Sequence, residues 1–222
     1  MMHEIRNKID QHAATCTDIM ELELTKPNRT KAKNCNFRMI YANPETSWYG
    51  YFMDNNMPDF TKDKWKEIVS GFFKKYHGLA KWHETIIEEV YRTGMYTGPT
   101  GRYWKFQKFQ QNDMSWDYSV GQIRNYMVQG TAGDVIKVAL VIANKRRKKA
   151  GLLLSKCVMC VHDSIIWDCP EEEAEELAKI NIEVFNEIPE ICERTFGFKM
   201  EIPIDGEADL GISWGEVAPL AI

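Results

Sequence analysis

A short apolar stretch, broken once by polar residues, constrains this chain more than any other segment. Residues 156–168 read KCVMCVHDSIIWD, so two apolar runs flank the triplet His162-Asp163-Ser164. Each run is too short for a helix and rich in strand-forming residues, which predicts a β-hairpin with Asp163 at its tip. A carboxylate among apolar neighbours is costly to desolvate, so Asp163 is a candidate metal ligand. The alternative is a turn residue that bonds its own backbone.

Length and composition fit a globular protein. The 222 residues, 44% of them apolar, can bury a core and suit one large domain or two small ones. We expect no membrane association, because no segment has the roughly 20 apolar residues of a membrane span. The N-terminus also lacks the apolar core of a signal peptide, so we expect a cytoplasmic protein, in the host cytoplasm if the source is viral. The net charge of −4 disfavours a uniformly basic nucleic-acid binder but permits basic patches, such as residues 145–149.

The six cysteines form no obvious framework, and Cys157 and Cys160 are the one close pair. A zinc site would need two further ligands at suitable spacing, which the sequence does not offer. In a regular strand these two thiols would also point to opposite faces. We therefore predict buried free thiols in a reducing compartment, and neither a zinc site nor a redox pair.

Four residues spaced by four mark the segment 29–41 as an unusual helix. Arg29, Lys33, Phe37 and Tyr41 would lie along one gently drifting stripe. Arginine offers a fork for phosphate oxygens, lysine a mobile charge, and an aromatic ring a platform for a flat base. The stripe therefore matches a nucleoside triphosphate lying along a helix. The alternative is a surface helix whose aromatic rings pack inward while its cations are merely solvated.

The patterning elsewhere predicts mostly helices. Helices are expected from the cap Asp10 to Ile19, from the cap Thr61 to a closing Gly78, from Trp82 to Gly94, at 118–149 and at 171–185, with a hairpin at 95–104 and strands at 200–202 and 207–210. Asn125 and Gln129 lie one turn apart in the long helix, and amide side chains suit groove edges and sugars. Arg102, in the hairpin, is a candidate phosphate contact.

Several motifs, read in order, resemble the C-terminal part of a family A DNA polymerase, and together they cover essentially the whole chain. The stripe with Asn36-Phe37 resembles the nucleotide-binding helix of the fingers, and DQHAAT at 10–15 resembles the segment before it. Residues 75–102 resemble the helices and hairpin that follow, and NYMVQGTAGDVIK at 125–137 resembles the palm helix that contacts the primer-template. Val161-His162-Asp163 resembles the catalytic turn, and the ending with Gly211, Trp214, Gly215 and Glu216 resembles the closing segment.

This resemblance implies an α+β fold, with helical fingers at 1–117 and the C-terminal part of a palm with an antiparallel sheet at 118–222. The result would be an incomplete right-hand polymerase fold. The implied function is template-directed DNA synthesis from dNTPs on primer-template DNA by two-metal nucleotidyl transfer. The implied roles are triphosphate binding by Arg29 and Lys33, Lys33 being also catalytic, base and template contact by Phe37 and Tyr41, DNA contact by Asn125, Gln129, His162 and Arg102, and magnesium binding by Asp163.

The sequence also departs from the family pattern. Ser164 stands where a glutamate usually follows the aspartate, Gly121 stands where an arginine is expected, and Arg38 and Ala42 replace glycines of the fingers helix.

The family's other metal-binding aspartate, which lies upstream of the fingers, has no counterpart, and Asp168 is too far along the strand to replace it. We therefore expect a split polymerase, completed by a second polypeptide that carries the thumb and the first palm strand, with two magnesium ions in the complete enzyme. The alternatives are a noncatalytic DNA-binding or structural remnant and a fragment of a single-subunit RNA polymerase.

Overall fold

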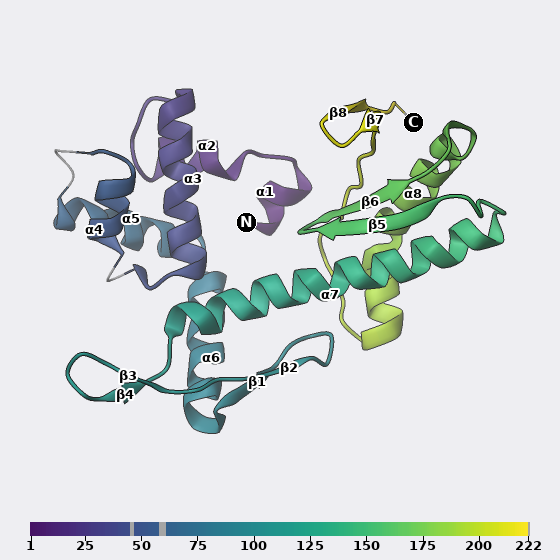
Figure 1. Ribbon diagram of the computed structural model, residues 1–222. Helices are drawn as coiled ribbons and strands as arrows, with labels where there is room; N and C mark the ends of the chain where they lie inside the picture. Colours follow the sequence, from purple (N-terminus) through teal and green to yellow (C-terminus); the bar gives the residue numbers. More distant parts are fainter. Residues whose placement is uncertain (45–46, 58–60, 222) are drawn as a thin grey trace. The chain divides into compact units, whose positions relative to one another are not determined.

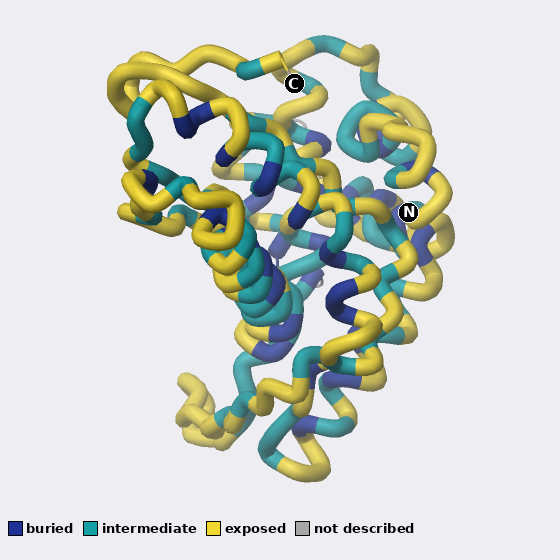
Figure 2. Tube along the Cα trace, turned by 90° about the vertical axis from the view of Figure 1, so that its right-hand side faces the viewer, coloured by how far each residue is buried: buried dark blue, intermediate teal, exposed yellow. Residues whose placement is uncertain are grey.

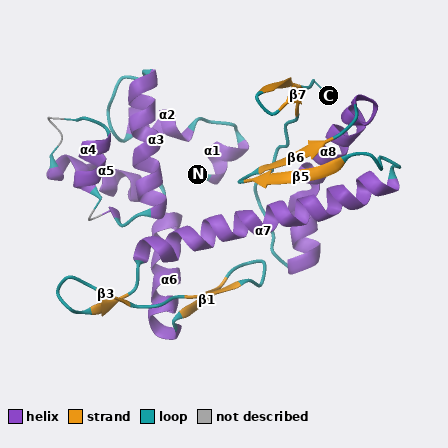
Figure 3. Ribbon diagram, viewed as in Figure 1, coloured by secondary structure: helices purple, strands orange, loops and turns teal. Residues whose placement is uncertain are grey.

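The computed structural model describes residues 1–44, 47–57 and 61–221, which combine helices with small antiparallel sheets, as an α+β protein does (Figures 1 and 3). The chain divides into two compact units. The first comprises residues 1–98 and 102–128, and the second comprises 99–101 and the residues from 129 onward. The division between the units falls inside helix α7 (Val120–Lys149). The domain boundary expected at 117/118 remains a prediction.

The first unit is mainly helical. Its elements are α1 (Met2–Arg6), α2 (Gln11–Asp18), α3 (Lys26–Tyr41), α4 (Trp48–Asp54), α5 (Lys62–Lys75), α6 (His77–Thr93), the hairpin of β1 (Met95–Thr97) and β2 (Tyr103–Lys105), the hairpin of β3 (Phe109–Gln110) and β4 (Trp116–Asp117), and the start of α7.

Side-chain caps explain where several of these helices begin. The Asp10 carboxylate accepts hydrogen bonds from the backbone N–H groups of the first turn of α2, and the Thr61 hydroxyl accepts one from the first turn of α5, so both predicted caps are confirmed. Gly94, at φ 73°, ends α6 as expected. The predicted closing role of Gly78 is wrong, because α5 ends at Lys75 and Gly78 lies in the first turn of α6.

The core of the first unit forms around the inner side of α3. Ala32, Cys35 and Met39 are fully buried there, packed with aromatic side chains of α4 and α5 that include Tyr51, Trp65 and Phe72. The Trp65 indole donates to the carbonyl of Pro44 at 2.6 Å, which satisfies its one polar atom. The prediction that the aromatic residues of the 61–78 segment belong to the core is therefore confirmed for Trp65, Phe72 and Tyr76, and the partly buried Phe73 packs against them.

The second unit joins the rest of α7 to a second long helix and two hairpins. Its further elements are β5 (Lys156–Val161), β6 (Ser164–Asp168), α8 (Glu171–Phe196), β7 (Asp209–Ser213) and β8 (Glu216–Pro219). Its core consists of small and branched residues of α7, such as Ala139 and Ala143, against Val184 and Ile188 of α8. Ile165 and Trp167 of β6, together with other partly buried apolar side chains, pack against this core.

Two predicted element boundaries in this unit are wrong. Helix α8 continues past residue 185, through Pro189, to Phe196, because the apolar stripe that includes Ile188, Ile191 and Cys192 continues into the core. Residues 200–202 form no strand, and the final hairpin is shifted to β7 and β8.

The β5–β6 hairpin is confirmed, and buried polar groups hold its start. The Glu173 carboxylate of α8 accepts hydrogen bonds from the N–H of Leu154 at 3.2 Å and from the N–H and hydroxyl of Ser155 at 2.9 and 2.5 Å. Arg147 of α7 donates to the Leu152 carbonyl, and its guanidinium lies 5.9 Å from the ring centroid of Trp167. These contacts fasten the hairpin to both helices.

A β-bulge in strand β5 overturns one argument made from the sequence. Cys157 pairs with Trp167 and Cys160 pairs with Ile165, with the irregularity between Cys157 and Met159. Because the partners lie two residues apart on a regular strand, both cysteines lie on the same face of the hairpin. The predicted burial is also wrong for this pair, since Cys160 is exposed and Cys157 is half-buried.

Within the described residues, α7 is the one helix long and apolar enough to cross a membrane by length and composition. Its apolar residues include Ile123 and Met127 in a core of the first unit and Val135 and Ala139 in the core of the second. These contacts bury part of the helix, and the absence of membrane association stays a prediction.

His83 makes stability depend on pH. Its ring is 3% exposed, near the rings of Phe73 and Trp82, and burial, assisted by the charge of Arg124, lowers its pKa from 6.5 to about 4. Between these two pH values His83 is protonated in the unfolded chain but neutral in the native state. The free energy of unfolding should therefore be highest above about pH 6.5 and should decrease as the pH falls toward about 4. The loss should be on the order of 3 kcal/mol.

Denaturant titrations across this pH range, followed by tryptophan fluorescence, would measure the effect. His83→Gln, which cannot titrate, should flatten the pH dependence. If the free energy of unfolding changed equally with pH in the variant and in the original protein, His83 would not be the cause of the pH dependence.

Candidate active site

The predicted stripe on α3 faces solvent. Ala32, Cys35 and Met39 occupy the buried side, whereas Arg29, Lys33 and Phe37 are exposed and Tyr41 is half-buried. Phe37 is 43% exposed, so the alternative in which the aromatic rings pack inward fails at this residue. We call Arg29, Lys33, Phe37 and Tyr41 the α3 stripe.

Neighbouring members of the α3 stripe contact one another. The Lys33 Nζ atom lies 5.6 Å from the centroid of the Phe37 ring, and the Phe37 and Tyr41 ring centroids are 6.1 Å apart. A cation, a flat apolar face and a second ring therefore follow one another along the helix. Such an arrangement can bind a ligand that is anionic at one end and aromatic at the other.

Arg29 is held by the residue that caps α2. Its Nε donates to Asp10 Oδ2 at 2.6 Å, and the two side chains are 44% and 42% exposed. The Arg29 hydrogen bond lowers the pKa of Asp10 from 3.8 to about 2, so this carboxylate is charged at neutral pH. Because the pair uses Nε, the terminal nitrogens of the guanidinium remain suited to a fork-like contact with an anion.

His12 is a further residue at this surface, and the sequence analysis did not identify it. Its Nδ1 lies 2.9 Å from the Asn36 amide nitrogen, and its ring meets that of Phe37 edge-on at 6.0 Å. Burial and then the charge of Arg29 lower the pKa of His12, which favours the neutral ring. No local pattern could reveal this contact, because it joins residues 24 positions apart.

The second predicted site is the two-residue turn between β5 and β6. Val161 pairs with Ser164, so His162 and Asp163 alone connect the strands. His162 has φ 53°, a left-handed conformation that such a turn needs at its first position. Both side chains are exposed, so Asp163 is presented to solvent at the tip of a fastened hairpin.

The described residues do not by themselves form a two-ion metal site. No group of three or more His, Cys, Asp or Glu residues gathers anywhere in the described part of the chain. Asp168 pairs with Lys156 at the far end of the hairpin, as expected, and so does not join Asp163. Within the described residues, Asp163 therefore offers a metal ion one carboxylate without a cluster of further acidic, histidine or cysteine ligands.

The remaining predicted DNA contacts lie on several elements. Arg102 is exposed just before β2, and Asn125 and Gln129 lie one turn apart on α7, half-buried and exposed respectively. Arg124 donates to the Ala42 carbonyl at the end of α3, so it serves the fold and does not simply replace the arginine expected at Gly121.

Arg38, which stands where the family has glycine, also has a structural partner. It pairs with Asp54 of α4, and a Cβ at Gly50 would lie 3.2 Å from its terminal nitrogen.

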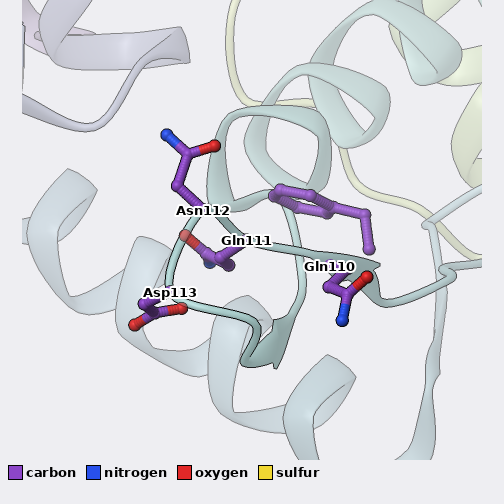
Figure 4. Close-up of a pocket in the computed structure, with 5 residues that line it drawn as sticks. Gln110, Gln111, Asn112 and Asp113 are labelled. Atoms are coloured by element: carbon purple, nitrogen blue, oxygen red, sulfur yellow. The ribbon is translucent and has the colours of Figure 1, made fainter.

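A hollow of about 420 Å³ lies at the tip of the β3–β4 hairpin, lined by Phe109, Gln110, Gln111, Asn112 and Asp113 (Figure 4). The labelled polar side chains point in different directions from the loop. Several make local bonds instead: Asp113 accepts from the N–H and hydroxyl of Ser115, and Gln110 donates to the Met114 carbonyl. The hollow is therefore the inside of a turn and shows no sign of a binding site.

The predicted residues thus belong to two groups. The α3 stripe, Arg102 and Asn125 lie in the first unit, and Gln129, His162 and Asp163 lie in the second. Within each unit the predicted placement on a helix or a turn is confirmed, while the role of each residue remains a prediction.

Comparisons with known proteins agree with this arrangement. The sequence matches the family described as DNA polymerase family A over residues 1–216. It is 26% identical to DNA polymerase I of Bacillus caldotenax over 92% of this chain and 22% of that protein, and 26% identical to DNA polymerase I of Aquifex aeolicus over 96% and 35%. It is also 26% identical to the DNA polymerase of Bacillus phage SP01, over 95% of this chain and 23% of that protein.

A solved structure supports the same fold. The chain resembles the POL domain of Pol1 from M. smegmatis, solved in complex with DNA primer-template and dNTP, with a TM-score of 0.73 and 19% identity. The match covers 92% of this chain and 34% of that one, so the predicted α+β fragment of a polymerase fold is confirmed. The chain spans only about a fifth to a third of the length of these relatives. Sequence and fold together show that the chain belongs to DNA polymerase family A.

Proposed function

We propose that this chain is the nucleotide-binding and partial catalytic region of a template-directed DNA polymerase. The observation that carries the proposal is the α3 stripe, whose Arg29, Lys33 and Phe37 all face solvent from one side of a helix with a buried opposite side. Lys33 lies 5.6 Å from the centroid of the Phe37 ring, so a cation and a flat apolar face are presented together, as a ligand with an anionic end and an aromatic end requires. The relative of known structure was solved with primer-template DNA and dNTP, which supports the same partners here.

The α3 stripe would hold the incoming nucleotide. The guanidinium of Arg29, oriented through Nε by Asp10, and the Lys33 ammonium would bind phosphate oxygens, and the aromatic pair would contact the base. Lys33 would also neutralise charge that develops on the triphosphate as the leaving group departs. Asn125, Gln129, Arg102 and His162 would contact the primer and template through their sugars and phosphates.

Asp163 would be one ligand of the divalent ions that the reaction uses. Magnesium, when bound, would activate the primer hydroxyl and stabilise the triphosphate charge. The turn contributes by presenting the Asp163 carboxylate in a fixed position, since its strands are paired up to Val161 and Ser164. Ser164 contributes no carboxylate, so this chain offers the ions less charge than the usual family turn.

We further propose that other polypeptide completes the enzyme, as a second subunit with the missing aspartate and the thumb. The support is the state of the sheets in the second unit. Each of these sheets is two-stranded among the described residues, and β7 and β8 are exposed at every position (Figure 2). Ile212 of β7 is 93% exposed, and Trp214 in the turn between the two strands is 63% exposed. Isolated two-stranded sheets are marginally stable, and exposed apolar strand edges invite pairing with another strand.

The two alternative functions, a fragment of a single-subunit RNA polymerase and a noncatalytic remnant, can be distinguished from DNA synthesis. Membership of DNA polymerase family A favours DNA synthesis over the single-subunit RNA polymerase reading. A noncatalytic remnant would keep the fold and DNA affinity but would not need Asp163, so the catalytic test below separates it from a polymerase.

The first test concerns nucleotide binding by the chain itself. Arg29→Ala and Lys33→Ala should each weaken binding of a fluorescent deoxynucleoside triphosphate about 10-fold, because each removes a charged hydrogen bond worth about 1.5 kcal/mol. Lys31→Ala removes the same charge from the same helix but off the α3 stripe, so it should have little effect. Loss of DNA binding with unchanged nucleotide affinity would contradict the assignment.

A second test concerns Asp163 in the enzyme completed with its partner. Asp163→Asn should preserve the turn, because asparagine also tolerates turn geometry, and should lower single-nucleotide incorporation by orders of magnitude across a magnesium titration. Asp168→Asn, at the far end of the same hairpin, is the matched control and should remain active. Ser164→Glu should leave the incorporation rate nearly unchanged and should lower the magnesium concentration needed for half-maximal activity. Near-normal extension by Asp163→Asn would leave Asp163 as a turn residue only.

The third test concerns completeness. The isolated chain should show no robust primer extension and should self-associate with rising concentration in analytical ultracentrifugation, because its strand edges are open. Ile212→Lys should reduce this association, whereas Met114→Lys, which adds the same charge at an exposed turn of the other unit, should not. Extension by the pure chain alone would refute the need for a partner.

A further inference from the structure

Two thiols of the second unit lie together next to the β5–β6 turn. Cys157 and Cys160 occupy the same face of the hairpin, opposite Trp167 and Ile165, because the bulge takes up the extra residue between them. Burial and then the charge of Cys160 raise the pKa of the Cys157 thiol. The Cys157 thiol donates to the Met159 carbonyl at 3.8 Å.

The pair is accessible, unlike several other cysteines. Cys160 is exposed and Cys157 half-buried, whereas Cys16, Cys35 and Cys192 are buried. The face that carries the pair also carries Ile165 and Trp167, which pack toward α7 and α8. A ligand bound by both sulfurs would therefore sit at the edge of the helix-facing side and be reached from solvent through Cys160.

The spacing favours a bridging ligand over a direct disulfide. The two cysteines lie opposite residues that are two apart on a strand, so their Cα atoms are about 6.6–6.8 Å apart. Disulfides span about 4.4–6.8 Å between Cα atoms and most often about 5.5–6 Å, so the pair lies at the upper end of that range. An atom inserted between the sulfurs relaxes that requirement.

The number of ligands restricts the chemistry. No third His, Cys, Asp or Glu joins the pair within the described parts of the chain, and zinc prefers four ligands. Thiolates alone select soft centres such as Cu⁺. Trivalent arsenic in an arsenical likewise needs only two sulfurs, because its third position is already filled.

We propose that Cys157 and Cys160 form a dithiol site for a thiophilic ligand, a soft metal ion or a trivalent arsenical bound by both sulfurs, on the strand that leads to Asp163. The site is independent of the proposed polymerase function, since it needs only the bulged strand and its two thiols. Occupancy would fix the bulge three residues before the turn.

Phenylarsine oxide is a suitable probe, because its capture involves no oxidation. Two S–H bonds lose their protons, two arsenic–sulfur bonds form, and the arsenic-bound oxygen leaves as water. The intact chain should take up one arsenical that resists an excess of a monothiol and is released by a dithiol. Peptide mapping of the unmutated chain should locate it on both Cys157 and Cys160.

Single substitutions complete the test. Cys157→Ser and Cys160→Ser should each lower the apparent affinity about 100-fold, because a single thiol loses the advantage of two linked ligands. Cys169→Ser, which changes a half-buried thiol of the same unit, should bind as the original does, and melting curves should show that all three variants fold. An adduct on other cysteines, release by monothiol, or undiminished capture by either serine variant would overturn the proposal.

Discussion

The unequal sides of helix α3 are the constraint on which the nucleotide surface depends. One side carries Ala32, Cys35 and Met39, which are completely buried in the core of the first unit. Because that side is fixed by packing, residues spaced by four on the other side can only point outward. The exposure of Lys33 and Phe37 is thus a consequence of the core, and it needs no ligand to maintain it. The Arg29 side chain is further oriented by Asp10, which caps the start of α2 and also accepts a hydrogen bond from Arg29 on α3.

The second unit places its carboxylate by a different means. A two-residue turn has little freedom once both strands are paired, so the orientation of Asp163 depends on how firmly the hairpin is held. That hold comes from buried polar contacts at the other end, where Glu173 satisfies Ser155 and Arg147 satisfies the Leu152 carbonyl. Buried polar groups whose partners are removed cost about 1–3 kcal/mol each, so these bonds specify the position of the hairpin as well as stabilise it.

Local signals in the sequence predicted much of this structure. The caps Asp10 and Thr61, the hairpin around Asp163 and the α3 stripe were all legible, because each depends on residues within a few positions of one another. The failures were also local in origin. Gly78 looked like a helix end but lies inside the first turn of α6, where an exposed glycine is tolerated. The helix expected at 171–185 is too short, because buried residues continue at steps of three and four through Ile188 and Ile191, past Pro189.

What the sequence could not reveal depends on contacts between distant segments. His12 reaches Asn36 and Phe37 only because α2 packs on α3, and no periodicity within either helix signals this. The bulge in β5 is a similar case, because strand alternation predicts opposite faces for Cys157 and Cys160 and one extra residue reverses the result. The one extra residue of the bulge therefore decides whether the two cysteines of this C-x-x-C sequence lie on opposite faces as separate thiols or on the same face as a pair. In a strand the register against the partner, and not the spacing along the chain, decides which chemistry two cysteines can share.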